Sequence, residues 1–259
     1  MTEKDTKAGI ITHGDEEDMF PDIPYEDYDT NPEIWSEEAD LTGRTSLWHP
    51  DADRSIPMRT KGSYADGYPV GAVIHATVGR TQKGDYDAEN TIKGGAHKHL
   101  YFCISSTGKL YQPAPLSRWG IHAGRSYAAG LGSSLDNKLV GIEICNAGIV
   151  VEYGDGFKAD GWNEKFKKDE VRYTEKIHNV TKAGNYHKYN TKQEEVLIDL
   201  LLWLKSNNPS VFQLENVLGH DEVAVNKQGK LGRKQDPGGS LSSYMPQFRQ
   251  LLLSRALIS

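Results

Sequence analysis

The sequence predicts an α/β fold, with a central mixed β-sheet flanked by helices and an acidic N-terminal extension. After about residue 65, short apolar runs of strand length are followed by an amphipathic segment of helical length. Before that point the charge is very different, because residues 1–40 hold 14 acidic and 2 basic residues. The 259 residues are enough for one large domain. We expect the extension to span residues 1–45 and a single folded domain to span residues 46–259.

Five apolar runs are the predicted strands. They are rich in β-branched and aromatic residues, which favour strands. The second and third are joined by Ser106-Thr107-Gly108, a turn sequence that predicts a β-hairpin. The runs occupy residues 72–77, 100–105, 109–112, 140–145 and 216–219.

Two helices are predicted in the C-terminal third. Thr191-Lys192-Gln193-Glu194 has the form of a capping box, and apolar residues then recur at helical spacing from Val196 to Leu204. Asn207-Asn208-Pro209 ends this helix, and a second helix is expected over residues 245–257.

Residues 149–189 form a polar insertion that is too long for an ordinary connection. It can be interpreted as a solvated surface segment or as a rim or lid beside a functional site. Residues 164–176, which are highly charged, have a weak helical pattern.

The acidic extension contains aromatic residues, including Phe20, Tyr25 and Trp35, that could anchor it to a surface. Residues 41–259 carry an excess of basic side chains. We therefore expect the extension to dock on its own domain or on a virion or secretion partner.

Composition limits the compartments and partners. No run of about 18 apolar residues predicts a membrane span, and the N-terminus lacks the pattern of a secretory signal. The two cysteines, Cys103 and Cys145, lie in apolar runs and favour a reducing compartment.

A mildly basic domain suits an anionic polymer such as bacterial cell wall. Nucleic acid is not expected, since no basic stripe is interleaved with aromatic residues.

Three side chains suited to zinc stand in segments that would present them: His75 in a strand, His220 after a strand, and Asp236 before Pro237 in a turn. Two imidazoles and one carboxylate leave a fourth position on Zn2+, as in hydrolytic zinc sites. The alternatives are core histidines and a plain turn aspartate. His97 and His99 form a His-x-His pair that could bind metal on a strand, but we favour a surface or pocket-edge role for it.

Five stretches in order resemble the zinc-dependent N-acetylmuramoyl-L-alanine amidases of type 2, whose fold is shared with peptidoglycan recognition proteins and amidase-type phage lysozymes. The resemblance covers about residues 65–255, and Val73-Ile74-His75-Ala76-Thr77 matches the strand of the first ligand. The other stretches are 101–112, Trp119-Gly120-Ile121-His122-Ala123-Gly124, Val140-Gly141-Ile142-Glu143-Ile144, and Leu218-Gly219-His220 with Lys234-Gln235-Asp236-Pro237-Gly238.

The resemblance implies that Zn2+ is held by His75, His220 and Asp236, with Glu143 as the acidic catalytic residue. Independently, a carboxyl inside an apolar strand needs a functional reason, and Glu143 is suited to be a general base. Lys234 lies two residues before Asp236, so an extended chain would direct both side chains the same way, where the ammonium could stabilise an oxyanion.

The substrate-binding candidates are His122, Trp119, Thr77 and Asn146. Two departures from the family stand out. Leu100 replaces a tyrosine or small polar residue that many members carry, and the segment between His220 and Asp236 is longer than is common.

What the resemblance implies is a hydrolase of peptidoglycan or muropeptides that cleaves the amide between N-acetylmuramic acid and L-alanine. With no signal peptide, synthesis in the cytoplasm is expected, followed by action on the cell wall after release or within a virion. The missing signal suits a phage-type lysin and a recycling enzyme alike, and the acidic extension, which is more than a recycling enzyme needs, favours the phage-type lysin. The alternatives are a cytoplasmic muropeptide-recycling amidase and a non-catalytic muropeptide-binding protein.

Overall fold

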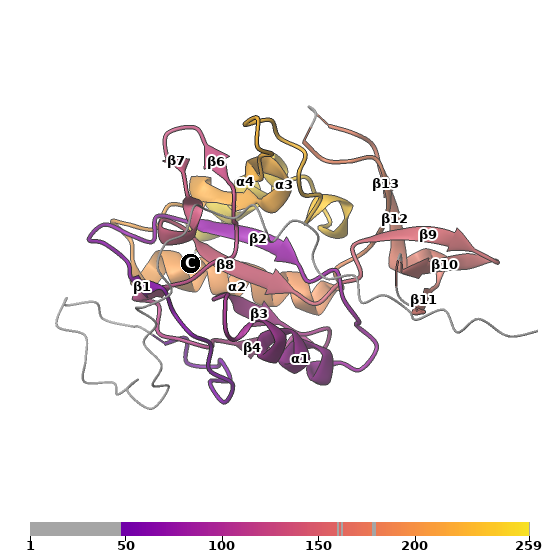
Figure 1. Cartoon of the computed structure of the whole chain (residues 1–259), viewed down its shortest axis with the longest axis horizontal. Coiled ribbons are helices and arrows are strands. Elements are labelled where there is room, and N and C mark those ends of the chain that lie inside the picture. The colour runs from indigo at the N-terminus through magenta and orange to yellow at the C-terminus, as the bar shows by residue number, and fades with distance from the viewer. Residues whose placement is uncertain (1–47, 160, 162, 178–179, 259) are drawn as a thin grey trace, which may run out of the picture.

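The computed structural model describes residues 48–159, 161, 163–177 and 180–258. The predicted acidic extension, residues 1–45, lies outside the described residues. Figure 1 shows a central sheet with helices around it and a second sheet at one end. Two short strand pairs complete the described strands, namely β1 (Gly62–Ser63) with β5 (Arg118–Trp119) and β6 (Tyr127–Ala128) with β7 (Gly132–Ser133).

The central sheet has the strand order β14-β2-β8-β3-β4. Its first four strands are parallel and β4 is antiparallel to β3, so the prediction of a mixed sheet is confirmed. The strands are β2 (Ala72–Ala76), β3 (Phe102–Ile104), β4 (Leu110–Tyr111), β8 (Val140–Ile144) and β14 (Val217–Gly219). Each of the five predicted runs contains one of them.

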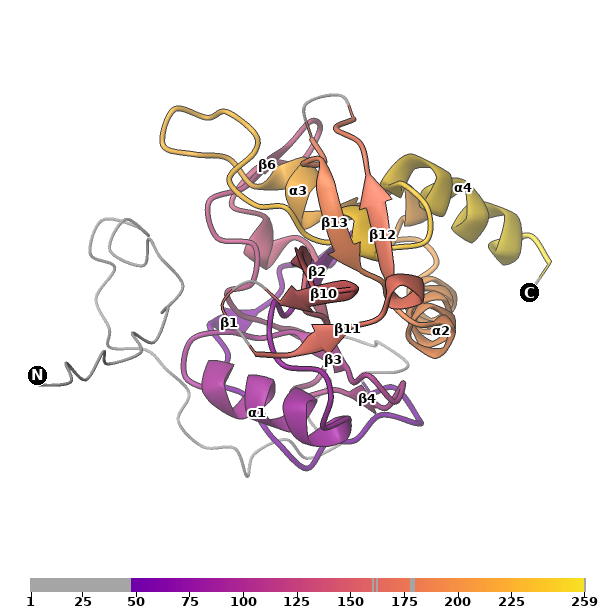
Figure 2. The ribbon, with the colours of Figure 1, turned by 90° about the vertical axis from the view of Figure 1, so that its right-hand side faces the viewer.

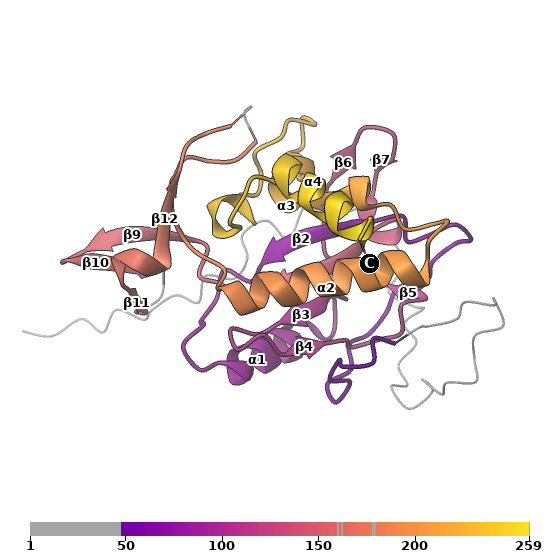
Figure 3. The same cartoon turned by 180° about the vertical axis from the view of Figure 1, so that it is seen from behind.

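Helices cover both faces of this sheet. On one face, α2 (Thr191–Asn207) and α4 (Met245–Ala256) pack on Ile74, Ile142 and their neighbours (Figure 3). On the other face, α1 (Asp85–Gly95) contributes Ile92 to a cluster with Cys103 (Figure 2). Burial on both faces explains why the parallel strands read as continuous apolar runs. Among the described residues, every helix is too short or too polar to span a membrane.

The N-terminal cap of α2 differs from the prediction by one residue. Asn190, not Thr191, accepts from the backbone N–H of Gln193 at 3.0 Å, and Gln193 Oε1 accepts from the Asn190 N–H at 3.1 Å. The side chain of Glu194 instead accepts from the Ser242 N–H at 2.6 Å, which ties α2 to the segment before α4. Asparagine is as good a cap as threonine, so local pattern alone could not choose between them.

The insertion is a second, antiparallel five-stranded sheet, ordered β11-β10-β9-β13-β12. The weak helix predicted over residues 164–176 is wrong, because that segment contains β11, a 3-10 helix (η5, Lys168–Glu170) and β12. Phe157 and Phe166 are paired across β10 and β11 and join a small apolar cluster with Val150. The strands are β9 (Ile149–Tyr153), β10 (Gly156–Ala159), β11 (Lys165–Phe166), β12 (Val171–Thr174) and β13 (Gly184–His187).

Two buried polar residues join this second sheet to the edge of the first sheet at which β2 and β8 end. Glu164 accepts from the Thr81 N–H at 3.0 Å, in the loop that follows β2. Asn146, which is fully buried after β8, donates to the His187 carbonyl at 3.0 Å and accepts from the Ser240 hydroxyl at 3.0 Å. The insertion is therefore fixed to the ends of β2 and β8 rather than loosely attached.

His187 is expected to make stability pH-dependent. Burial lowers the pKa of His187 from 6.5 to about 4, and its ring centroid lies 4.2 Å from that of Phe166. Between pH 4 and pH 6.5 the unfolded chain therefore binds more protons at this residue than the folded protein does. The contribution of the neutral His187 ring to the free energy of unfolding is therefore complete above pH 6.5, and it is lost as the pH falls toward 4. It amounts to at most roughly 3 kcal/mol.

Urea unfolding of the wild type and His187→Gln at pH 7 and pH 5 measures this contribution. We expect the wild type to lose more stability than the variant on acidification, since the other histidines are present in both proteins. Equal losses would contradict the assignment.

Candidate active site

Three potential metal-ligand atoms converge at one edge of the central sheet. His75 Nδ1 lies 2.9 Å from His220 Nδ1, and Asp236 Oδ2 lies 3.1 Å from His220 Nδ1 and 3.5 Å from His75 Nδ1. Zinc–ligand bonds of about 2.0–2.1 Å in a tetrahedron place ligand atoms about 3.3 Å apart. The geometry of the three atoms therefore matches a tetrahedral zinc site with one open position.

The sheet topology brings these residues together from distant parts of the chain. His75 is the fourth residue of β2, and His220 is the first residue of α3 (His220–Val223), directly after β14. Because β14, β2 and β8 are parallel, their carboxyl ends meet at the same edge of the sheet. Asp236 reaches this edge from the loop after α3, and its Oδ2 accepts from the Ala76 N–H at 3.3 Å.

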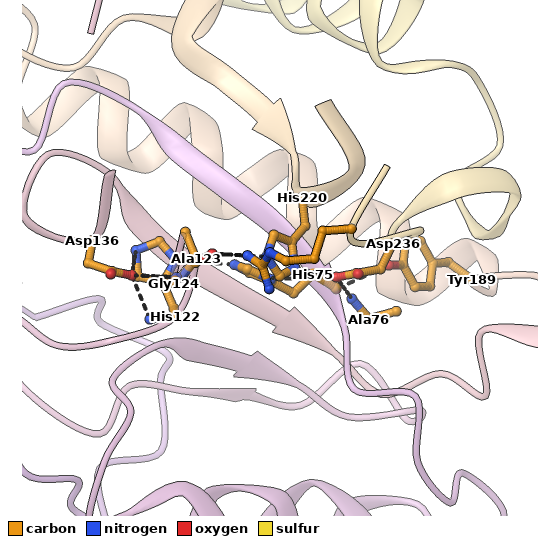
Figure 4. A network of polar contacts seen from close by, with 10 residues as sticks. His75, Ala76, His122, Ala123, Gly124, Asp136, Tyr189, His220 and Asp236 are labelled. Carbon is orange, nitrogen blue, oxygen red and sulfur yellow. Dashed lines mark hydrogen bonds and ion pairs between the residues drawn. The ribbon is translucent and has the colours of Figure 1, made fainter. Parts of the chain in front are cut away.

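Hydrogen bonds behind His75 determine which ring nitrogen carries its proton (Figure 4). His122 Nε2 lies 2.9 Å from the Leu139 carbonyl oxygen, which can only accept, so this nitrogen donates. Burial lowers the pKa of His122, so the ring is neutral and its Nδ1 accepts. Nδ1 of His122 lies 3.1 Å from His75 Nε2, which is therefore the donor. The lone pair of His75 Nδ1 is left for a metal.

The same reasoning holds for His220. Its Nε2 lies 3.2 Å from the Ala123 carbonyl oxygen and therefore donates, so in the metal-binding form of the ring the lone pair is on Nδ1. Burial lowers the pKa of His75 to about 3, so that ring is neutral. Two nitrogen lone pairs and a carboxylate oxygen then face one another inside the protein. Such a set repels itself unless a cation lies between them, so the residues fit a divalent metal.

Asp236 completes the set as an ionised carboxylate. Burial raises the pKa of Asp236, and protonated forms of His220 and His75 would hold it well below its usual range. With both imidazoles neutral, a metal cation between the three residues would stabilise the carboxylate in the same way. Its backbone carbonyl accepts from the Asp221 N–H at 2.7 Å, so the segment is fixed to the start of α3.

Glu143 lies beside this group. It pairs in register with His75 across β8 and β2, so the two side chains share a face of the sheet. Its Oε2 is buried and has no hydrogen-bond partner among the described residues. Burial raises the pKa of Glu143 to about 8, the charge of Asp236 adds to the increase, and Lys234 opposes it. A carboxyl group with a pKa near neutrality can both accept and return a proton.

The loop that carries His122 is held by one carboxylate. Asp136 Oδ1, in a 3-10 helix (η4, Leu135–Asn137), accepts from the backbone N–H groups of His122 at 2.8 Å, Ala123 at 2.7 Å and Gly124 at 3.3 Å. Figure 4 shows Asp136 at one end of the network and Asp236 near the other. Asp136 therefore fixes the groups behind both potential histidine ligands, although no local signal in the sequence identified it.

The structure places the predicted substrate-binding residues differently from expectation. The side chain of His122 is 1% exposed and Asn146 is 0% exposed, so both serve internal hydrogen bonds instead of a substrate. Trp119 packs against the core cluster on the α2 face, whereas His75 lies on the other face. Thr77 is half-buried near the site, and its hydroxyl is bonded to the backbone of Asn146. Thr77 lies near the site, so its contact with a substrate stays a prediction, as does that of the half-buried Trp119.

Other candidates from the sequence take structural positions. His97 is exposed after α1, and His99 forms a bridge with Ile121; among the described residues, the group of potential metal ligands contains His75, His220 and Asp236. Cys103 and Cys145 are both buried free cysteines.

Two positioning residues were missed by sequence reasoning. The Tyr189 hydroxyl donates to the His75 carbonyl at 3.1 Å. Gly141 lies under the His122 ring, where a Cβ atom would be 2.6 Å from His122 Cγ. A glycine inside an otherwise apolar strand is a signal of such close approach, and it could have been used.

Gly141→Ala is expected to displace the His122 ring and remove the acceptor for His75 Nε2. Loss of such a supporting contact costs about 10–100-fold in metal affinity. Zinc affinity of the purified variant measures this effect. Gly94→Ala in α1 is the matched control, since a Cβ atom there meets nothing within 4 Å. Equal zinc affinities for the two variants would contradict the role of Gly141.

Fold and site together define an α/β protein with a group of three residues that could hold a metal ion and a buried carboxyl oxygen beside it. The family model for N-acetylmuramoyl-L-alanine amidase matches residues 65–239, more than half of the chain. The chain therefore belongs to the N-acetylmuramoyl-L-alanine amidase family. The matched residues include the four site residues His75, Glu143, His220 and Asp236.

Solved structures show similarity at low identity. AmiD from E. coli, in complex with anhydro-N-acetylmuramic acid-L-Ala-D-gamma-Glu-L-Lys, is 19% identical, with a TM-score of 0.46 over 74% of this chain and 59% of AmiD. AmpDh3 from Pseudomonas aeruginosa, in complex with anhydromuramic pentapeptide, is 18% identical, with a TM-score of 0.45 over 72% of this chain and 61% of AmpDh3. PGRP-SA from Apis mellifera is 14% identical, with a TM-score of 0.39 over 72% of this chain and 86% of PGRP-SA.

The chain thus spans less than two thirds of AmiD and of AmpDh3. Among proteins of curated function, none is matched by this chain.

Proposed function

We propose that this protein is a zinc-dependent amidase that hydrolyses the bond between N-acetylmuramic acid and L-alanine in peptidoglycan or muropeptides. The observation that carries the proposal is the convergence of His75 Nδ1, His220 Nδ1 and Asp236 Oδ2 within 3.5 Å, in a chain of the amidase family. A bound zinc ion supplies Lewis-acid chemistry, polarising an amide carbonyl and lowering the pKa of water.

Each residue of the site has a distinct task in this proposal. Glu143 takes a proton from the attacking water and returns it to the leaving nitrogen. Its unpartnered Oε2 supports this task, because a buried carboxyl oxygen without a hydrogen bond is costly for a purely structural residue. Lys234, whose charge acts on Glu143, stabilises the negative charge that develops on the carbonyl oxygen.

The ligands are held by groups that do not contact the substrate. The carbonyls of Leu139 and Ala123, the first of them through His122, set the tautomers of the two histidines. Such supporting contacts raise the basicity of the ligand nitrogens and fix their orientation.

The test is zinc content and product analysis for the purified full chain. We expect about one zinc per chain, and release of stem peptides with a free L-alanine amino group from purified peptidoglycan. A protein that binds zinc and muropeptides but releases no peptide would instead be a binding protein. Absence of bound zinc would overturn the proposal.

For the biological setting we propose a phage-type lytic role, free or virion-associated. The strongly acidic segment of residues 1–40 supports it, because a recycling enzyme has no need of such a segment. Relative rates on intact cell walls and on soluble muropeptides distinguish the two roles. A strong preference for soluble muropeptides would favour the cytoplasmic recycling amidase.

A further inference from the structure

The segment of fifteen residues between His220 and Asp236 is longer than the family resemblance leads one to expect. After α3, part of this segment forms a closed loop. Val225 and Leu231 form an antiparallel bridge at its base. Within it, the Asn226 Oδ1 atom accepts from the backbone N–H groups of Gln228 and Lys230, each at 2.9 Å. The two ends of the loop, Val225 and Leu231, therefore lie side by side, and the chain continues from Leu231 to Asp236. Figure 2 shows this loop projecting beside β6.

Arg233 fastens the base of this loop. Its Nε donates to the Val225 carbonyl at 3.0 Å, and its Nη2 donates to the carbonyls of Ala123 and Arg125, both at 2.9 Å. The Arg125 carbonyl also accepts from the Val225 N–H at 3.1 Å. One guanidinium thus joins the loop before Asp236 to the segment that follows His122.

One of these acceptors is shared with a metal ligand. The Ala123 carbonyl that receives Arg233 Nη2 also receives the Nε2–H of His220 at 3.2 Å. This is the contact that fixes the His220 tautomer. Arg233 is also only three residues from Asp236, whose Oδ2 lies 3.1 Å from His220 Nδ1. The arginine therefore lies between the supports of the second and third ligands.

We propose that Arg233 is a positioning residue of the metal centre, which orients His220 through the Ala123 carbonyl and brings Asp236 into place despite the long loop. The inference rests on the metal centre proposed above. It concerns this chain in particular, because the loop that Arg233 fastens is the part of the site that departs from the family pattern.

The chemistry of the side chain explains why arginine is needed. A guanidinium presents five N–H donors in a rigid plane and can serve three carbonyls at once. A lysine ammonium is a compact point charge on a flexible stem, so it can hold only part of this arrangement. Alanine would leave the Ala123 and Arg125 carbonyls without these donors and free the base of the loop.

The experiment measures Zn2+ affinity of the full chain by competition with a chromophoric chelator. Arg233→Ala is expected to weaken affinity by about 10–100-fold, the range seen when a supporting contact of a metal ligand is lost. Arg233→Lys is expected to fall between Arg233→Ala and the wild type. Lys230→Ala is the matched control, since it removes an exposed cation from the tip of the same loop and should leave affinity unchanged.

A second readout separates positioning from general stability. The visible absorption of the Co2+-loaded protein reports ligand geometry, and we expect it to change in both Arg233 variants but not in Lys230→Ala. If Arg233→Ala does not fold, Arg233→Lys decides the question. The inference is overturned if the Arg233 variants match Lys230→Ala in affinity, or if they lose apo-protein stability without any change in affinity or spectrum. If the wild type binds no Zn2+, the proposed function and this inference fail together.

Discussion

Glu143→Gln is expected to lower the rate of amide hydrolysis by about 100- to 10,000-fold, the usual contribution of a general acid–base group. Glutamine has nearly the same shape but cannot accept the proton of the attacking water. The metal-ligand atoms belong to other residues, so zinc content should not change. Hydrolysis of purified peptidoglycan and zinc analysis on the same sample measure the two quantities.

The control for this substitution is Cys103→Ala. Cys103 pairs in register with Glu143 across β3 and β8 and is fully buried, so its truncation disturbs the same part of the sheet without removing a proton acceptor. We expect Cys103→Ala to retain activity. An active Glu143→Gln enzyme, or equal losses in both variants, would exclude Glu143 as the base.

His220→Ala is expected to abolish stoichiometric zinc binding together with activity. Only His75 Nδ1 and Asp236 Oδ2 would remain, 3.5 Å apart, and two ligands are too few for a stable zinc site. A ligand that binds only the folded state stabilises it by about 4 kcal/mol at a free concentration of 1,000 Kd. Added Zn2+ should therefore raise the Tm of the chelator-treated wild type but not that of the variant.

His97→Ala provides the comparison, because it removes an exposed imidazole outside the ligand group. This variant should behave as the wild type in both zinc titration and thermal unfolding. A zinc-dependent rise in Tm that survives His220→Ala but is lost in His97→Ala would place the metal elsewhere in the protein.

Much of the central sheet could be predicted because its strands are buried on both faces. Such strands appear as continuous apolar runs, and an ionisable residue inside one of them is conspicuous. His75 in β2 and Glu143 in β8 were recognised for this reason. The second sheet was missed because its strands are short, partly exposed and separated by charged turns. In such short segments, apolar residues show neither the two-residue alternation of a strand nor the 3.6-residue repeat of a helix clearly enough to be recognised.

The supporting residues of the site could not be predicted in the same way. His122 was interpreted as a substrate contact, and only its place between His75 and the Leu139 carbonyl shows that it is buried. Asp136 acts on backbone groups of a neighbouring loop, and Arg233 acts on the same loop from more than a hundred residues away. No spacing or periodicity reports such contacts, since they depend on where two loops meet in space.

The sequence by itself determined the class of fold, the three potential zinc ligands and the acidic residue beside them, because residue type and burial pattern are local properties. The tertiary structure decided what those residues can do. Parallel strands end at a common edge, which brings His75, Glu143 and His220 together, and carbonyl acceptors on neighbouring loops fix the imidazole tautomers. The direction of a lone pair is set by the partner of the opposite ring nitrogen, and that partner is chosen only when the chain folds.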